Sequence, residues 1–342
     1  MKKLVLIDGH SILNRAFFGI PDLTNAEGLH TNAVYGFLNI LFKLLEEEKP
    51  DCLAVAFDLK APTFRHQMYD DYKGTRKPMP EELHEQVPLM KEALTAMGIP
   101  ILTKEGYEAD DILGTVAKKA QEKGAEVTIV SGDRDLLQLA DTHIKISIPK
   151  TSRGSTEIHS YYPADVEREY QVTPKQFIDV KALMGDASDN IPGVPSVGEK
   201  TATSLIVQYG SLPGVYEHIS EVKPPRAKKS LEEHKDLADL SYALAEICIE
   251  APVDFSMENA KIGDLYTKEA YEFMSRMEFK SLLARFGDHV KKEAAASHDF
   301  KAVTDLSQAE SLFEEAMKAE RIGGNLLTDG KTVCGLSLCW DE

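Results

Sequence analysis

The chain has 342 residues, of which 43% are hydrophobic and 28% are charged, and its formal net charge is −17. This composition is typical of a soluble globular protein with one large domain or two ordinary ones, and it excludes low-complexity and fibrous proteins. No stretch is long and apolar enough to span a membrane, and the first apolar run ends at Asp8, too early for an export signal. The four cysteines have neither zinc-type nor disulfide-type spacing, which favours a reducing cytoplasm.

Three short apolar runs in the first half of the chain, LVLI, LAVAF and VTIV, lead to Asp8, Asp58 and Asp133 respectively. Short continuous apolar runs separated by helical patterns indicate buried parallel strands of an α/β sheet, and residues 144–148 form a further candidate strand. Ligand sites in open α/β sheets lie beyond the carboxyl ends of the strands. We therefore expect the three aspartates to meet at one edge of the sheet.

The stretch GYEADD places three carboxylates, Glu108, Asp110 and Asp111, at the start of a predicted helix. The helix is predicted because apolar residues recur with helical spacing from Ile112 onward. A single capping acid would satisfy the backbone there, so three acids need another explanation. The helix precedes the strand that leads to Asp133, so its N-terminus can face the same edge of the sheet.

Nine acids are candidate site residues, and they follow predicted strands or flank predicted helices. They are Asp8, Asp58, Glu108, Asp110, Asp111, Asp133, Asp135, Asp186 and Asp189. Each alone is most simply a helix cap or a turn residue. Gathered together, they would repel one another strongly unless cations were bound or several were protonated. Oxygen ligands suit Mg²⁺ or Mn²⁺, and two such ions can support phosphodiester hydrolysis.

A net charge of −17 argues at first against a nucleic-acid partner, because phosphate binding needs Lys and Arg. The nine candidate acids, however, account for more than half of that charge. If these nine acids bind cations in one site, the rest of the protein is much less acidic. A basic surface near the site is then compatible with the net charge of −17.

The segment from Lys60 to Glu82 has no sustained apolar face and interleaves basic with aromatic residues. The basic residues are Lys60, Arg65, Lys73, Arg76 and Lys77, and the aromatic ones are Phe64, Tyr69 and Tyr72. The simplest interpretation is a solvated loop. The alternative is an element that binds single-stranded nucleic acid, with basic groups on phosphates and aromatic rings stacked on bases.

From Thr173 onward the pattern becomes helical and contains the stretch GDASDNIPGVPSVGEKTA. A P-loop is excluded because Glu199 separates Gly198 from Lys200, which breaks the G-K-[ST] ending. Two interpretations remain open. One is an ordinary helical hairpin, and the other is a pair of helices joined by a tight turn whose N–H groups hold a phosphate.

Six motifs occur together and in order over roughly residues 1 to 290. They are LVLIDGH, FDLKAPTFRHQMYDDYKGTR, GYEADD, SGDRDLLQL, GDASDNIPGVPSVGEKTA and LADLSYAL. In these motifs the chain resembles the flap-endonuclease family, in particular the 5′ nuclease domain of bacterial DNA polymerase I. The resemblance implies a PIN/flap-endonuclease-like α/β fold, with a mainly parallel central sheet, flanking helices, a helical arch and a helix-hairpin-helix subdomain.

The same resemblance implies roles for particular residues. Asp8, Asp58, Glu108, Asp110 and Asp111 would lie around one metal, and Asp133, Asp135, Asp186 and Asp189 around a second. The segment at about 60–82 would be the arch through which a 5′ single strand passes, with Tyr72, Lys73 and Arg76 on the DNA and the two basic residues also catalytic. The turn that binds duplex DNA, often with K⁺, would use Gly193, Val194, Val197, Gly198, Lys200 and Thr201. Ser196 stands where the family usually has a glycine, and a position that needs φ > 0 would strain a serine.

The predicted domains are a catalytic core (1–172), a helix-hairpin-helix subdomain (173–290), an Ala-rich linker (291–300) and the truncated start of a 3′-5′ exonuclease-like domain (301–342). In that last segment we expect strands around 322–327 and 333–339, with unpaired edges unless they form a hairpin. A proofreading domain would carry an Asp-x-Glu pair here. The sequence has Asn325 and Leu327 instead, so this segment is expected to be inactive.

We therefore expect a divalent-metal-dependent 5′-3′ exonuclease or flap endonuclease, cytoplasmic and monomeric. Its substrates would be DNA flaps and 5′ ends, and RNA primers, in replication and repair. The polymerase domain that accompanies this nuclease in the family does not follow here. One alternative is a related metal-dependent α/β ribonuclease, which would not need the hairpin after Asp189. The other is a non-catalytic DNA-structure-binding module, which would be expected to have lost some of the acids.

Overall fold

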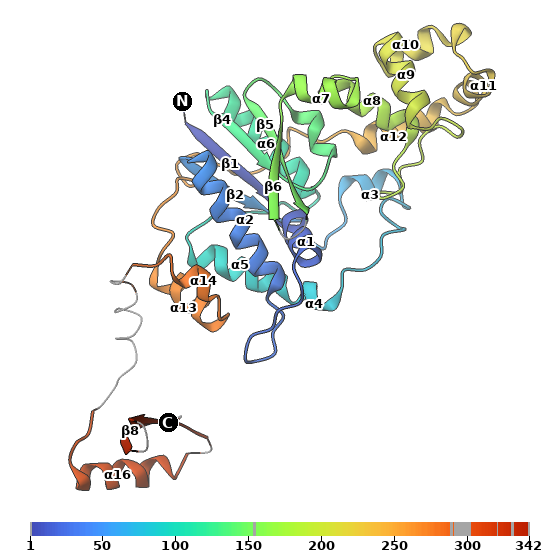
Figure 1. Ribbon diagram of the computed structural model, residues 1–342. Helices are drawn as coiled ribbons and strands as arrows, with labels where there is room; N and C mark the ends of the chain where they lie inside the picture. Colours follow the sequence, from blue (N-terminus) through green and yellow to red (C-terminus); the bar gives the residue numbers. More distant parts are fainter. Residues whose placement is uncertain are drawn as a thin grey trace. The chain divides into compact units, whose positions relative to one another are not determined.

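The computed structural model describes residues 2–152, 155–287, 290, 302–319, 321–329 and 332–340 (Figure 1). The chain divides into two compact units, Met1–Lys291 and Lys292–Glu342, and each is described by itself. This boundary falls where the sequence predicts a linker, although residues 291–300 themselves lie outside the described residues. No helix of the described ranges is long and apolar enough to cross a membrane.

The first unit is built on a six-stranded sheet with the strand order β3-β2-β1-β4-β5-β6. The strands are β1 (Lys3–Asp8), β2 (Cys52–Ala56), β3 (Ile101–Leu102), β4 (Glu126–Val130), β5 (Ile144–Ser152) and β6 (Ser155–Tyr161). The first five run parallel, and β6 runs antiparallel to β5. The three apolar runs that lead to aspartates are therefore neighbouring strands at the centre of the sheet. The predicted, mainly parallel α/β class is confirmed.

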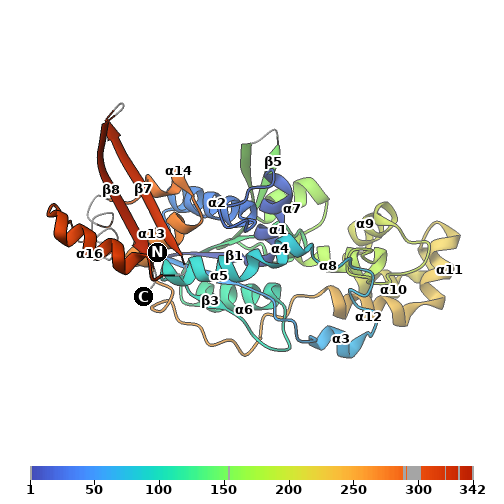
Figure 2. The ribbon, with the colours of Figure 1, turned by 90° about the horizontal axis from the view of Figure 1, so that it is seen from below.

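The continuous apolar run of β1 is explained by helices on both faces of the sheet. Leu4 and Leu6 belong to one apolar core with α6 (Ala109–Glu122). Val5 and Ile7 belong to a second core on the opposite face. The helices of that second face are α1 (Gly9–Gly19), α2 (Asn32–Glu48) and α5 (Gln86–Ala96). Because successive strand residues point to opposite faces, a strand covered on both sides needs an apolar residue at every position. Figure 2 shows α2 and α6 on opposite sides of β1.

The segment from residue 163 to residue 245 is helical and lies at one end of the sheet (Figure 1). Its elements are α7 (Pro163–Tyr170), α8 (Pro174–Met184), α9 (Glu199–Tyr209), α10 (Leu212–Glu217), η2 (Ile219–Glu221), α11 (Pro225–Glu233) and α12 (Lys235–Ala245). Apolar residues of α8 to α12 join the same core as α6. The helical part is thus continuous with the sheet in its packing.

After α12 the chain returns to the sheet. The N–H of Leu53 in β2 donates to the Ala260 carbonyl at 2.8 Å. Two short helices follow, α13 (Lys268–Arg276) and α14 (Lys280–Leu283), whose apolar residues belong to the second core with α2 and α5. The segment predicted as one subdomain, 173–290, is therefore shared between both faces of the sheet.

The second unit contains α16 (Leu306–Ala316) and a two-stranded antiparallel sheet of β7 (Ile322–Asp329) and β8 (Thr332–Trp340), which lie side by side in Figure 2. The predicted strands exist and pair as a hairpin. Several large apolar side chains on them remain exposed, among them Leu326, Leu327 and Val333.

Candidate active site

The predicted aspartates meet at the carboxyl edge of the sheet. Asp8, the last residue of β1, caps α1: its Oδ1 accepts the N–H of Ser11 at 3.0 Å, and its Oδ2 accepts the Ser131 hydroxyl at 2.8 Å. Asp58 follows β2, and its Oδ1 accepts the N–H of Ala109 at 2.8 Å. Ala109 is the first residue of α6, so this bond brings the start of that helix to the same edge, as the sequence predicted.

Five of the nine candidate acids line one cavity of about 840 Å³ at this edge. They are Asp8, Asp58, Glu108, Asp110 and Asp133. Lys73 and Arg76 line the same cavity. The acids and the cations that the sequence singled out separately therefore face one space.

Burial and neighbouring acids shift the pKa values of several cavity carboxylates. Burial, with Asp58 adding to it, raises the pKa of Asp8 to about 6. Burial, followed by Asp8 and Asp133, raises the pKa of Asp110 well above its usual value. At Asp58 burial opposes ionisation, but hydrogen bonds led by that from His10 outweigh it and lower the pKa. A bound cation would relieve the mutual repulsion of this group.

A second group of acids surrounds Lys181 on α8. Its Nζ lies 2.6 Å from Oδ1 of Asp135 and also donates to Asp186. Burial, followed by Asp133, raises the pKa of Asp135 to about 6. At Asp186 burial acts in the same direction, but hydrogen bonds led by Lys181 lower the pKa to about 2. Lys181 was not among the residues predicted from the sequence, although it lies on a predicted helix just ahead of the loop that carries Asp186 and Asp189.

The predicted DNA-contacting residues bind the acids directly. The hydroxyl of Tyr72 donates to Glu108 Oε2 at 3.1 Å and to Asp189 Oδ2 at 3.2 Å. Lys73 Nζ lies 2.7 Å from Glu108 Oε1, and Arg76 pairs with Asp189. The ring of Tyr72 is only 4% exposed, and burial, followed by the two acids, raises its pKa. Tyr72 is therefore packed against the acids rather than presented for stacking.

The predicted helical arch is helical only near its ends, in α3 (Phe64–Met68) and α4 (Glu81–His84). The residues between them form turns and extended backbone, because they have no apolar face to bury and include two prolines. Their main chain docks on the loop after α8, where the N–H of Lys73 donates to the Asp189 carbonyl at 2.8 Å.

Asp111 differs from its neighbour Asp110 because it is bound by a buried arginine and does not face the acidic cavity. The guanidinium of Arg65 donates to both of its oxygens, at 2.8 and 2.9 Å, and the N–H groups of Glu108 and Cys248 donate to the same carboxylate at 3.0 and 2.9 Å. Asp111 is fully buried and does not line the acidic cavity. In this geometry Asp111 is the counter-ion of a buried arginine, and its predicted place around the first metal stays a prediction.

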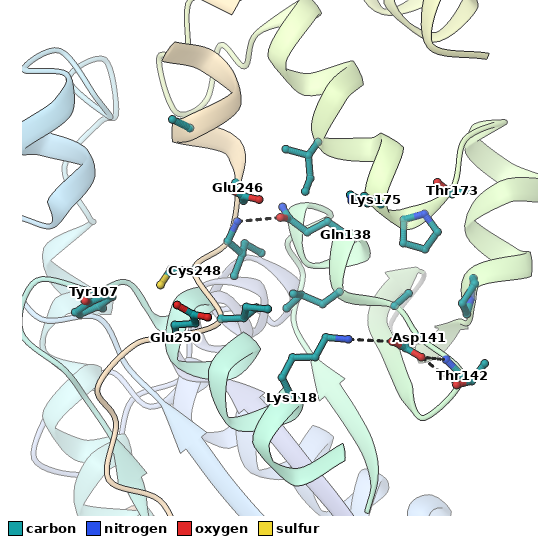
Figure 3. A pocket seen from close by; sticks show the side chains of 18 of the residues that line it. Tyr107, Lys118, Gln138, Asp141, Thr142, Thr173, Lys175, Glu246, Cys248 and Glu250 are labelled. Carbon is teal, nitrogen blue, oxygen red and sulfur yellow. Dashed lines mark hydrogen bonds and ion pairs between the residues drawn. The ribbon is translucent and has the colours of Figure 1, made fainter. Parts of the chain in front are cut away.

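Arg65 also holds the chain that follows α12. Its Nε donates to the Leu244 carbonyl at 2.9 Å, and its Nη2 donates to the Glu246 carbonyl at 2.7 Å. Gln138, in η1 (Asp135–Leu139), accepts the N–H of Ile247 at 2.9 Å. This bond lies at the second cavity, of about 890 Å³, which none of the nine acids lines (Figure 3). Arg65, Asp111 and Gln138 thus form a structural junction behind the acidic cavity.

The turn between α8 and α9 depends on two glycines. A Cβ atom on Gly193 would lie 2.3 Å from the nitrogen of Gly185, and both residues have positive φ. Only glycine allows so close an approach of two backbones. Val194 and Val197 are 2% and 4% exposed, so their side chains fix the turn from inside and could not contact a ligand.

Ser196 and the start of α9 form the outer side of this turn. Ser196 has φ +68°, so it lies in the left-handed region, where a serine is strained and a glycine would not be. Gly198 caps α9 without a side chain, which leaves the first N–H groups of the helix open. Lys200 and Thr201 lie in the first turn of α9, with Lys200 exposed.

Within the described ranges, no three His, Cys, Asp or Glu side chains are arranged closely enough to hold a metal ion as they stand. Several of the candidate acids instead hold cationic or hydroxyl groups of the chain itself. The pairs are Glu108 with Lys73 and Tyr72, Asp189 with Arg76 and Tyr72, and Asp135 and Asp186 with Lys181.

Family comparisons agree with this architecture. Residues 3–171 match the 5'-3' exonuclease, N-terminal resolvase-like domain, and residues 172–268 match the 5'-3' exonuclease, C-terminal SAM fold. The chain belongs to the 5'-3' exonuclease family, which is a family of nucleases.

The similar curated proteins are bacterial DNA polymerases. The chain is 45% identical to DNA polymerase I of Bacillus caldotenax over 306 residues, which cover 90% of this chain and 34% of that protein. It is also 45% identical to DNA polymerase I of Bacillus subtilis (strain 168) over 328 residues, which cover 95% and 37% respectively. The chain thus spans about a third of the length of these relatives.

Solved structures share the fold at low sequence identity. A structure of T5 5'-exonuclease with divalent zinc ions bound has a TM-score of 0.58 and 21% identity, and covers 86% of this chain and 100% of its own. The catalytic core of Rad2 in complex with a DNA substrate has a TM-score of 0.54 and 15% identity, and covers 83% and 91%. At these identities the likeness concerns the fold.

Proposed function

We propose that this chain is a divalent-metal-dependent nuclease that hydrolyses phosphodiester bonds at 5′ flaps and 5′ ends of DNA, and of RNA primers paired with DNA. The observation that carries the proposal is the cavity at the carboxyl edge of the sheet, which acids and the two cations Lys73 and Arg76 line together. A phosphodiester needs basic groups to hold it and anionic groups to gather metal ions beside it. One cavity offers both.

The donor set fits Mg²⁺ or Mn²⁺, because it consists of carboxylate oxygens. At Asp8 and Asp110 burial, with neighbouring acids adding to it, raises the pKa, and a bound cation would offset both effects. A first ion would lie among Asp8, Asp58, Glu108, Asp110 and Asp111, of which Asp111 is also bound by Arg65. A second ion would lie among Asp133, Asp135, Asp186 and Asp189. When bound, such ions would activate a water molecule and stabilise the leaving oxygen. Lys181 already supplies one positive charge to the second group.

In this proposal Lys73 and Arg76 hold the phosphate next to the bond that is cut. Both line the cavity. Lys73 is paired with Glu108, which faces the same cavity, and Arg76 is paired with Asp189, so the same side chains can contact substrate and orient the acids. Tyr72 acts as a positioning residue, because its hydroxyl bridges Glu108 and Asp189.

The turn between α8 and α9 would bind the duplex beside the cut. The open N–H groups at the start of α9, together with exposed Lys200 and with Thr201, favour a backbone phosphate there. A K⁺ ion at this turn, as the family resemblance implies, belongs to the same proposal. We further propose that the enzyme acts as a cytoplasmic monomer.

The second unit would contribute no 3′-5′ exonuclease activity. Asn325 pairs with Ser337 in the hairpin, and Leu327 pairs with Gly335. Neither Asn325 nor Leu327 can serve as an anionic metal ligand.

The test is cleavage of an end-labelled DNA with a 5′ flap, in Mg²⁺ and in EDTA. We expect a product cut near the base of the flap with Mg²⁺ and none with EDTA, and no cutting of a matched 3′ flap. Cleavage of RNA but not of any DNA flap would favour the ribonuclease alternative. Tight binding without cleavage in Mg²⁺ or Mn²⁺ would favour the DNA-binding module.

A second arm separates chemistry from duplex binding. Lys73→Ala and Arg76→Ala should lose flap cleavage while largely keeping duplex affinity, because each removes a phosphate partner at the cavity only. Lys200→Ala should weaken duplex binding instead. Normal flap cleavage by Lys73→Ala would contradict the role of the cavity cations.

A further inference from the structure

A strongly basic run lies next to the α8–α9 turn and takes no part in the site described above. The sequence KPPRAKK, residues 223–229, has four basic side chains and no acidic one. They are Lys223, Arg226, Lys228 and Lys229, and all but the half-buried Lys228 are exposed. The run forms the beginning of α11.

The charges in the first and last turns of α11 oppose the helix dipole, although Lys229 and Glu233 form an ion pair along the helix. Basic side chains occupy its first turn and no acid does, whereas its last residues are Glu232 and Glu233 and no basic residue lies in its last turn. The N-terminus of a helix is its positive end, where acids stabilise and cations destabilise. Helix stability therefore does not explain why this end of α11 is basic.

α11 is fixed against the outer side of the turn. Its buried face contributes Ala227 and Leu231, at 1% and 0% exposed, to the apolar core. The hydroxyl of Ser230 donates to the Pro195 carbonyl. The basic side of α11 is thereby held facing solvent, beside the open start of α9.

Ser196 connects the turn to this basic run. Its hydroxyl accepts the Nε–H of Arg226 at 3.1 Å. A serine at φ +68° carries a conformational cost that glycine would avoid. What serine provides in return, and glycine would not, is the hydroxyl that binds Arg226. Among the residues that the structure describes, the two terminal nitrogens of Arg226 have no hydrogen-bond or ion-pair partner. A guanidinium held through Nε presents its other donors as a fork, which matches the oxygens of a phosphate.

We propose that Arg226, oriented by Ser196, binds a phosphate of the duplex backbone, so that the duplex-binding surface extends from the start of α9 onto α11. The inference rests on the proposed function, because it assumes duplex DNA at the α8–α9 turn. It adds a contact made by this chain's own serine–arginine pair.

The test measures binding without cleavage. The full chain in EDTA is titrated against a labelled blunt DNA duplex at several salt concentrations from about 50 to 200 mM. Losing one phosphate contact should reduce the slope of log affinity against log salt by about 0.9, and should weaken binding about threefold or more at the low-salt end. Arg226→Ala is expected to show both changes. Arg226→Lys keeps the charge and should keep the slope, with weaker binding because the fork is lost.

Arg276→Ala is the matched control, since Arg276 is a half-exposed arginine on α13 paired with Glu92. Figures 1 and 2 place α13 and α11 at opposite ends of the first unit. This variant should bind as the unaltered protein does. Ser196→Ala should weaken binding in the otherwise unaltered protein but not in the Arg226→Ala background, because the hydroxyl acts through Arg226.

An unchanged salt slope in Arg226→Ala, or a change no larger than in Arg276→Ala, would overturn the inference. So would an equal effect of Ser196→Ala in both backgrounds, or an equal loss of affinity for single-stranded DNA. Failure of the proposed function is distinguishable, because it would appear as absent Mg²⁺-dependent flap cleavage in the unaltered chain. Thermal unfolding of each variant checks that the fold is intact, which is expected because Ser196 and Arg226 are both exposed.

Discussion

Asp110 and Asp111 are adjacent in the first turn of α6, yet they lie in opposite environments. Asp110 lines the acidic cavity, and burial together with Asp8 and Asp133 raises its pKa. Asp111 is fully buried behind the cavity, where Arg65 binds both of its oxygens. Successive residues of a helix point about 100° apart, so one turn can serve two regions.

The difference shows how to separate a functional acid from a structural one. An acid that the fold leaves without a counter-ion stores repulsion that a bound cation can release. An acid bound by an arginine through both oxygens and by two N–H donors is already satisfied, and its removal takes the nearest counter-ion from a buried charge.

Removing the unpaired charge should have the largest effect on activity. Asp110→Asn and Asp58→Asn should each lower the turnover of flap cleavage by orders of magnitude, because the site loses charge that it needs to hold metal ions. In Asp110→Asn the free energy of unfolding should stay the same or rise, because neutralising a carboxyl whose pKa is raised relieves repulsion. In Asp58→Asn it should fall somewhat, because the folded state lowers the pKa of Asp58 and so stabilises its ionised form. Turnover and urea unfolding measured on the same preparations check both. Full activity in Asp110→Asn would contradict the view that Asp110 helps to hold a metal ion.

Removing the paired charge should have its main effect on stability. Asp111→Asn leaves the buried Arg65 guanidinium with only the more distant Glu108, at 3.6 Å, as counter-ion, and the free energy of unfolding should fall by up to about 3–5 kcal/mol. Asp165→Asn is the matched control, because Asp165 pairs with the exposed Arg168 and should cost less than about 1 kcal/mol. Urea unfolding compares the two. A stable Asp111→Asn protein that cannot cut DNA would support the predicted place of Asp111 around the first metal.

The pH dependence of stability sharpens the comparison further. The folded-state pKa of Asp8 is about 6, above the ordinary value of 3.8. A carboxyl with a raised pKa favours the folded state in its protonated form. Its contribution is therefore complete below about pH 4 and is lost as the pH rises through about 6. A tenfold change in the acid dissociation constant corresponds to about 1.4 kcal/mol.

Urea unfolding in EDTA from about pH 4 to about pH 7 measures this effect. The metal-free protein should lose stability over that interval, and Asp8→Asn should lose less because the titrating group is gone. The same pH dependence in both proteins would mean that Asp8 does not carry unneutralised charge.

The smallest effect is expected from removing the second unit. A chain that ends at Lys291 should cut 5′ flaps at the original rate within about twofold, because the unit boundary falls there and none of the nine acids lies beyond it. Such a chain should also keep its thermal stability, since domains fold on their own cores. A shortened chain that folds but does not cut would show that the second unit contributes to the site.

Much of the arrangement follows from local patterns in the sequence. The apolar runs that end in Asp8, Asp58 and Asp133 fix three central strands, and parallel strands bring their carboxyl ends to one edge. The helical spacing after GYEADD places Asp110 near that edge, where it lines the cavity. These inferences depend on strand and helix geometry within a few residues, which the sequence displays directly.

Only the tertiary structure decided which charges are paired. Arg65 and Asp111 are 46 positions apart, and Tyr72 and Asp189 are 117 apart, so no local pattern joins them. Lys181 and Asp135 are separated by three elements, β5, β6 and α7, so the sequence did not show that they pair. The physical reason is that a sequence shows which residues can ionise, whereas the cost of burying each charge, and the partner that offsets it, depend on where distant segments pack. The sequence by itself thus determined the acidic edge, and the fold determined which of its acids remain free to hold cations.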